Sequence, residues 1–136
     1  MHQQCFQEPV AQVGRVLIAA SDHRMRASLR ALVQADGRYS VVAEACTVAE
    51  AVEFDQSLRP ALILLDLLFP MAVDGLDAVR LLALVSKRPI VVLSVQAGLR
   101  DAAYAAGATG FVVQGDDADA LLAVIRAAMV QPPFEP

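Results

Sequence analysis

Short apolar runs alternate along the chain with segments whose apolar residues recur at helical spacing. The runs are predicted to be strands and cover residues 15–20, 40–45, 61–66, 89–94 and 110–113. They are apolar almost throughout, instead of alternating with polar residues, which is typical of strands in a parallel sheet that is covered on both faces. A strand followed by a helix, repeated five times, predicts a doubly wound α/β domain with helices on both sides of the sheet.

Polar residues mark where the helices between these strands begin. Four of them are predicted to cap the longer helices, namely Asp22, Thr47, Asp74 and Asp117. Thr47 is followed three residues later by Glu50, which is the pattern of a capping box. The helices are predicted to end near residues 36, 58, 85 and 130, with stop signals at Gly37, Pro60 and the pair Pro132-Pro133. A shorter helix is predicted over residues 99–106.

The length of the chain and the spacing of its apolar residues set its broad class. With 136 residues, of which 57% are hydrophobic, the chain suits one domain with a sizeable core. We expect that domain over residues 15–131, with a flexible arm over 1–14 and a tail over 132–136. No apolar run reaches the ~18–20 residues that a membrane span requires, and the first residues lack the layout of a secretory signal. The expected location is therefore the cytoplasm, without membrane contact.

Charge and cysteine content argue against several classes of function. The net charge is −4 and the ten arginines are scattered, so direct binding of nucleic acid by this domain is not expected. Cys5 and Cys46 are expected to be free thiols, although a bridge between them stays open. Neither His2 nor His23 stands at metal-ligand spacing from a cysteine, so no metal site is expected there.

Polar residues also gather where the predicted strands end. In an open parallel sheet the functional crevice lies at the carboxyl ends of the strands. These ends carry Ala20-Ser21-Asp22, Asp66, Ser94 and Gln114. Asp66 is the sharpest signal, because a lone carboxylate after an apolar strand is costly to bury without partners. The alternatives are that Asp66 caps a turn, that Asp22 only caps its helix, and that Ser94 is a satisfied strand-end hydroxyl.

Several segments, in register with the predicted strands, resemble one protein family. The segments are Arg15–Ala19, Leu64–Pro70 followed by Asp74-Gly75, Val92–Ser94 and Ala106–Val113. They resemble the receiver domain of bacterial two-component response regulators, in which an aspartate is followed four residues later by a proline, as Asp66 is by Pro70. Asp22-His23 and the helix around Arg26 are similar to the subfamily that often carries a C-terminal helix-turn-helix. The resemblance covers almost the whole chain.

The resemblance implies a phosphorylation switch on a flavodoxin-like (βα)5 sheet with strand order 2-1-3-4-5. Asp66 would be the phospho-acceptor, which attacks a phosphohistidine and becomes an acyl phosphate. Ser94 would be the switch hydroxyl and Phe111 the switch aromatic, although Phe111 could equally be ordinary core. The implied partners are a sensor histidine kinase or phosphotransfer protein, or a regulated protein. Receivers commonly dimerise through their last helices and strands, which places such a surface in residues 99–130.

The sequence departs from the family's pattern in the residues expected around Asp66. In place of an acidic pair after the first strand and a lysine after the fifth, the chain has Ala20, Ser21 and Gln114. Asp22 stands one place late, and the only lysine, Lys87, belongs to the loop before the fourth strand. Magnesium is usually held through one or two carboxylates plus phosphate, so Asp66 and Asp22 should hold it weakly. A missing charged contact to the phosphoryl group removes about 1.5–3 kcal/mol of interaction.

Three functions are compatible with these residues. The first is a working receiver that accepts a phosphoryl group at Asp66, and the second is a pseudo-receiver, an interaction module that works without phosphorylation. The third is a small-ligand or flavin-binding protein of flavodoxin-like shape, although no glycine-rich phosphate loop follows the first strand. We expect a signalling domain that is not an enzyme and has an atypical acceptor site, with the pseudo-receiver as the alternative.

Overall fold

Five parallel strands form one twisted sheet in the order β2-β1-β3-β4-β5. The computed structural model describes residues 14–68 and 72–130. The strands are β1 (Arg15–Ala19), β2 (Ser40–Ala45), β3 (Leu62–Asp66), β4 (Ile90–Ser94) and β5 (Gly110–Val113). The predicted α/β fold and its strand order 2-1-3-4-5 are therefore confirmed.

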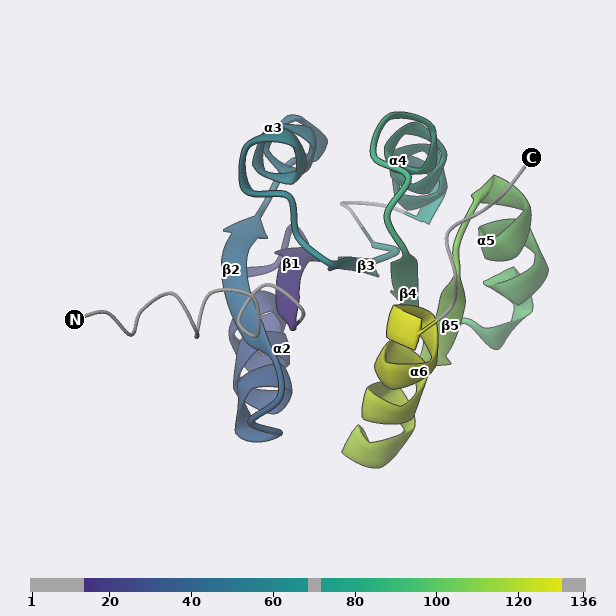
Figure 1. Ribbon diagram of the computed structural model, residues 1–136. Helices are drawn as coiled ribbons and strands as arrows, with labels where there is room; N and C mark the ends of the chain where they lie inside the picture. Colours follow the sequence, from purple (N-terminus) through teal and green to yellow (C-terminus); the bar gives the residue numbers. More distant parts are fainter. Residues whose placement is uncertain (1–13, 69–71, 131–136) are drawn as a thin grey trace.

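Helices cover both faces of this sheet (Figure 1). One layer contains α2 (His23–Ala35) and α6 (Ala118–Val130), and the other contains α3 (Val48–Leu58), α4 (Ala72–Val85) and α5 (Arg100–Ala106). A single 3-10 turn, η1 (Ala97–Leu99), leads into α5. In β3, Leu62 and Leu64 belong to the core beneath α2 and α6, whereas Ile63 and Leu65 belong to the core beneath the other layer. Because successive side chains point to opposite buried faces, the strand is apolar at nearly every position.

Three of the four predicted helix caps are present. The carboxylate of Asp22 accepts a hydrogen bond from the Arg24 N–H, and the Thr47 hydroxyl accepts one from the Glu50 N–H. The carboxylate of Asp117 likewise accepts from the Ala120 N–H at 2.9 Å. Each bond satisfies an amide that has no partner inside its helix, which is why these side chains fix the helix starts.

The fourth predicted cap, at Asp74, is wrong. Helix α4 begins at Ala72, so Asp74 lies inside its first turn. A Cβ atom at Gly75 would stand only 1.9 Å from the Leu67 carbonyl oxygen, so this turn sits directly against the backbone that follows β3. This close approach of Gly75 to the Leu67 backbone, together with the strong helix propensity of alanine at position 72, favours a helix start upstream of Asp74. The prolines at 70, 132 and 133, whose roles were predicted, lie outside the described residues.

The described part of the chain starts at Gly14, directly before the central strand β1. The N–H of Ser40 donates to the Gly14 carbonyl at 2.8 Å, and a Cβ atom at Gly14 would approach the Arg38 carbonyl oxygen to 2.2 Å. Gly14 thus packs with the domain, and the arm predicted over 1–14 otherwise lies outside the described residues. Among residues 14–68 and 72–130, no helix is both long and apolar enough to cross a bilayer.

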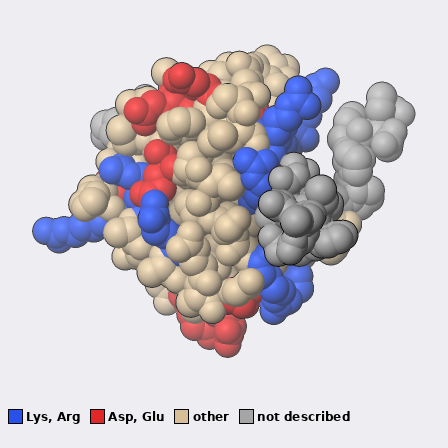
Figure 2. Space-filling model, turned by 60° about the vertical axis from the view of Figure 1, so that its left-hand side comes forward, with Lys and Arg blue, Asp and Glu red and all other residues tan. Residues whose placement is uncertain are grey.

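Charged side chains on the surface stand in small groups. Figure 2 shows acidic and basic residues distributed over one face with uncharged surface between them. Glu44 on β2 is one such centre, because it pairs with both Arg26 and Arg30 of α2. Charge is thus compensated locally between β2 and α2.

A buried ion pair joins elements at the amino end of β4, opposite to the strand ends that carry Asp66. The Arg88 guanidinium donates to the carboxylate of Asp55 at 3.1 Å and to the Pro60 carbonyl at 2.6 Å. Asp55 is 1% exposed and lies on α3, whereas Pro60 precedes β3. One arginine therefore connects α3, the entry to β3 and the entry to β4.

Candidate functional site

Asp66 ends β3 and is almost completely buried, with 4% of its surface exposed. Its Oδ1 accepts a hydrogen bond from the Leu68 N–H at 3.3 Å. Burial raises the pKa of Asp66, the Leu68 hydrogen bond lowers it, and the neighbouring Asp22 carboxylate raises it, with a net upward shift. The structure thus brings Asp66 and Asp22 together at the carboxyl end of the sheet.

The loop after β1 is built without the acidic pair. Ala20 is fully buried, and its N–H donates to the Ala45 carbonyl at 3.0 Å. The Ser21 hydroxyl donates to the Leu68 carbonyl at 3.3 Å, which connects this loop directly to the segment after Asp66. Arg26 donates to the carbonyls of Ala20 and Ser21 at 2.8 and 3.1 Å, so both carbonyls are already engaged.

The oxygen atoms of Asp66, Asp22 and Ser21 fit a magnesium ion poorly. Among residues 14–68 and 72–130, no group of three histidine, cysteine, aspartate or glutamate side chains is placed to hold a metal. One oxygen of Asp22 already accepts from the Arg24 N–H at 3.0 Å, and the Ser21 hydroxyl is directed to Leu68. Magnesium requires near-octahedral oxygen ligation, and Asp66 and Asp22 each have one carboxylate oxygen that already accepts a backbone N–H.

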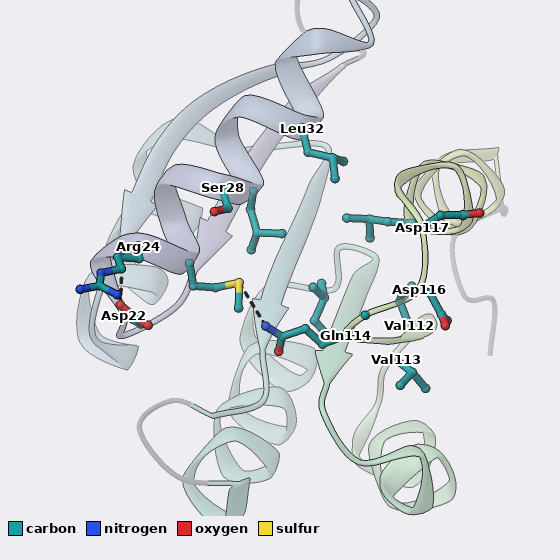
Figure 3. Close-up of a pocket in the computed structure, with 14 residues that line it drawn as sticks. Asp22, Arg24, Ser28, Leu32, Val112, Val113, Gln114, Asp116 and Asp117 are labelled. Atoms are coloured by element: carbon teal, nitrogen blue, oxygen red, sulfur yellow. Dashed lines mark hydrogen bonds between the residues drawn. The ribbon is translucent and has the colours of Figure 1, made fainter.

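Ser94 ends β4 and Gln114 directly follows β5; Ser94 makes local hydrogen bonds, whereas Gln114 contacts α2. Ser94 is 2% exposed, and its hydroxyl accepts from the Gln96 N–H at 3.0 Å and donates to the Gln96 carbonyl at 3.1 Å. The Gln114 amide donates to the sulfur of Met25 on α2 at 3.9 Å (Figure 3). Lys87 lies at the opposite end of β4, in the turn before that strand, and cannot replace the missing lysine.

Gln114 lines a cavity of about 330 Å³ between α2 and the segment from β5 to α6 (Figure 3). Most of the inner wall is apolar and belongs to the core on one face of the sheet, with contributions from α2, β4, β5 and α6: Met25, Leu29, Leu93, Val112 and Leu121. Asp22, Asp116 and Asp117 also line it. One end of the cavity is lined by Asp22, the carboxylate that neighbours Asp66.

Phe111 is an inward-facing residue of β5, with 4% of its surface exposed. Its ring belongs to the core beneath α3, α4 and α5, together with Ile90 and Val92. The guanidinium carbon of Arg100 lies 4.9 Å from the ring centroid, which is a cation–π geometry. Sequence reasoning missed Arg100, because its contact with Phe111 exists only where α5 passes over β5.

We expect Asp66→Asn to be more stable than the parent protein at about pH 7. The raised pKa means that the folded state binds more protons at Asp66 than the unfolded chain does, so stability falls as pH rises above 3.8 and through the folded pKa. Asparagine removes that cost and can still accept from the Leu68 N–H. Urea midpoints should differ most at neutral pH and converge as the pH approaches 3.8. A variant that is less stable at neutral pH would contradict this account of Asp66.

Comparisons with known proteins agree with this architecture. The family model described as "Response regulator receiver domain" matches residues 16–126. Transcriptional regulatory protein PdtaR of Mycobacterium tuberculosis is 34% identical over 117 residues, covering 85% of this chain and 56% of that protein. Protein-glutamate methylesterase/protein-glutamine glutaminase 4 of Myxococcus xanthus is 40% identical over 80 residues, covering 59% of this chain and 22% of that protein. The chain therefore spans only part of the length of these relatives.

Solved structures show the same fold. The response regulator domain of Thermotoga maritima CheB superposes with a TM-score of 0.78 at 26% identity, covering 88% of this chain and 98% of that one. A LuxR-family two-component response regulator from Aurantimonas sp. superposes with a TM-score of 0.76 at 25% identity, covering 85% and 84%.

Proposed function

This chain belongs to the response regulator receiver family, and on that premise we propose that it is an atypical receiver in which Asp66 accepts a phosphoryl group slowly. One observation carries the proposal: a buried carboxylate ends β3 at the crevice, and the groups that shift its pKa include another carboxylate but no basic side chain. The position supports acceptor chemistry. The missing positive charge supports slow accumulation of the product.

The chemistry requires only a carboxylate oxygen with access to a phosphodonor. An Asp66 oxygen attacks phosphorus of a phosphohistidine whose other ring nitrogen carries a proton, the phosphorus–nitrogen bond breaks, and the histidine leaves as neutral imidazole. The Leu68 N–H orients the carboxylate, and the Ser21 bond to the Leu68 carbonyl holds that segment in place. Gln114 offers a neutral amide where a lysine would stabilise the phosphoryl oxygens, so the acyl phosphate is less stabilised.

The test is intact mass spectrometry after treatment with acetyl phosphate or phosphoramidate, with and without magnesium. We expect a minor phosphorylated fraction that depends only weakly on magnesium and is lost in Asp66→Asn. Asp77→Asn serves as the matched control, because it makes the same substitution at a carboxylate that is 68% exposed on α4 and leaves the acceptor intact. A chain that stays unmodified with every donor would rule out the acceptor function of Asp66.

A second function, a pseudo-receiver that binds its partner without phosphorylation, is favoured by Phe111 and Ser94. The ring is already buried, and the hydroxyl is already satisfied by Gln96, so neither residue requires a phosphoryl group to reach this arrangement. Under this alternative, partner binding would be equal in the parent protein and in Asp66→Ala. Loss of partner binding in Asp66→Ala would contradict the pseudo-receiver and favour a receiver that acts through phosphorylation.

The partners that this function requires are a sensor histidine kinase or a phosphotransfer protein, and a regulated protein, acting in the cytoplasm. A homodimer surface on residues 99–130 would be formed by α5, β5 and α6. Tyr104 supports that choice, because it is a large side chain on α5 that is 43% exposed. Sedimentation of the parent protein and of Tyr104→Glu would test it.

A further inference from the structure

We propose that Ser21 is a positioning residue for Asp66, and that its hydroxyl, held in place by Arg26, joins the loop after β1 to the segment after β3 without a metal ion. The inference deepens the proposed function and rests on it for its meaning in the reaction, because Asp66 is the carboxylate that would accept the phosphoryl group. Its geometry and its test concern the unmodified protein. A failure of phosphorylation would therefore leave the inference itself standing.

The connection consists of two hydrogen bonds that meet at Leu68. The Ser21 hydroxyl donates to the Leu68 carbonyl at 3.3 Å, and the Leu68 N–H donates to Oδ1 of Asp66 at 3.3 Å. The loop after β1 thus engages one polar group of the Leu68 backbone, and the Asp66 carboxylate engages the other. Because both bonds share this residue, a displacement of Ser21 would move the donor that orients Asp66.

Arg26 holds the loop after β1 from the side of α2. Its guanidinium donates to the carbonyls of Ala20 and Ser21 at 2.8 and 3.1 Å, and its backbone N–H donates to the Asp22 carbonyl at 3.0 Å. Hydrogen bonds from a charged donor are stronger than those between neutral groups. All three carbonyls of this loop are therefore bonded to one residue, which fixes the place of the Ser21 hydroxyl.

Glu44 connects the Arg26 guanidinium to the sheet. Its carboxylate lies on β2, 3.6 Å from Nε of Arg26, and both side chains are mostly buried. Glu44 also pairs with Arg30, whose side chain is 53% exposed. In the part of the chain that the structure describes, Arg30 makes no hydrogen bond to the loop after β1. Arg30 therefore shares the partner of Arg26 without sharing its contact to the loop.

The chemistry of a hydroxyl explains why this connection requires no cation. A serine hydroxyl has a proton to donate, so it can bond directly to the Leu68 carbonyl oxygen. An ionised carboxylate at position 21 would only accept, and it would face the carbonyl oxygen without a proton between them. A cation would then be required to join the two oxygens. Serine at position 21 thus makes the connection between the two segments independent of magnesium.

The Leu68 amide reports this connection in NMR spectra, because its N–H is bonded to Asp66. Ser21→Ala should move its proton resonance upfield and accelerate its hydrogen exchange about fivefold, the effect of one ordinary hydrogen bond. Ser21→Thr keeps the hydroxyl and should preserve the parent signal. Magnesium should leave this amide unchanged in the parent protein and in Ser21→Ala.

Ser21→Asp separates the hydroxyl from a metal. Without magnesium it should resemble Ser21→Ala, because the donor is lost. With magnesium its Leu68 amide should return toward the parent exchange rate, because the new carboxylate joins Asp66 and Asp22 as a ligand beside the Leu68 carbonyl. A parent protein that responds to magnesium as strongly as Ser21→Asp would overturn the metal-independent connection.

Arg26→Met should change the Leu68 amide as Ser21→Ala does, and the two substitutions together should add nothing further. Arg26→Lys should retain most of the parent signal. Arg30→Met is the matched control, because it removes the other partner of Glu44 and should leave the Leu68 amide unchanged. Additive effects of Ser21→Ala and Arg26→Met would contradict the role of Arg26, as would equal effects of Arg26→Met and Arg30→Met.

An unchanged Leu68 amide in Ser21→Ala would overturn the inference as a whole. No phosphodonor enters these measurements, so they are independent of the mass-spectrometric test of the acceptor. A parent protein that stays unmodified, beside a Leu68 amide that responds to Ser21→Ala, would refute the acceptor function and support the connection. A phosphorylated parent protein with an unresponsive Leu68 amide would do the reverse.

Discussion

Replacing Arg88 by methionine is expected to lower the free energy of unfolding by about 3 kcal/mol or more, because it leaves a buried carboxylate without its partner. Asp55 is 1% exposed, and Arg88 holds it at 3.1 Å while also satisfying the Pro60 carbonyl. Methionine keeps an unbranched apolar stem but is shorter than arginine, and it removes the charge and all of the donors. The urea midpoint should fall by about 1–3 M.

A matched control separates burial from charge pairing. Arg80→Met breaks the pair between Arg80 and Asp77 on the exposed face of α4, where both side chains are more than half exposed. That pair is expected to contribute less than about 1 kcal/mol. The double variant Asp55→Leu with Arg88→Met should recover much of the loss, because it leaves no unpaired charge in the interior. Equal costs for Arg88→Met and Arg80→Met would show that the buried pair has no special weight.

Replacing Gln114 by lysine is expected to raise the phosphorylated fraction of Asp66 by on the order of tenfold to a hundredfold. A hydrogen bond to a charged group contributes about 1.5–3 kcal/mol, and each 1.4 kcal/mol corresponds to a factor of about ten. Among the residues that the structure describes, the Gln114 side chain has one hydrogen-bond partner, the Met25 sulfur at 3.9 Å, so little is lost by replacing it. The measurement is intact mass against time with a fixed concentration of acetyl phosphate.

The control for this gain is Gln56→Lys, which adds the same charge on the exposed surface of α3. It should leave the phosphorylated fraction unchanged, whereas Asp66→Asn in the Gln114→Lys background should abolish it. An equal rise in both lysine variants would point to net charge and not to a local contact. If Gln114→Lys does not raise the phosphorylated fraction, a positive charge at the end of β5 does not stabilise a phosphoryl group on Asp66.

The position of Asp66 at the end of β3 and the elements around it could be predicted because they depend on local patterns. The apolar run that ends at Asp66 defines β3, and the Thr47 and Asp117 caps define the starts of α3 and α6. Such signals involve residues within a few positions of each other, so they can be recognised in the sequence alone. The prediction for α4 failed because Gly75 meets Leu67 by tertiary packing, which the local polar signal at Asp74 does not report.

The sequence by itself determined the order of strands and helices, the burial of the strands on both faces and the position of Asp66 at their carboxyl ends. Only the tertiary structure decided what surrounds that carboxylate. Ser21 bonds to Leu68 from another strand end, and Arg100 covers Phe111 from another element. The periodicity of a strand or helix depends on residues that are neighbours in the sequence. These contacts instead join segments that meet only after the sheet and its helices have packed.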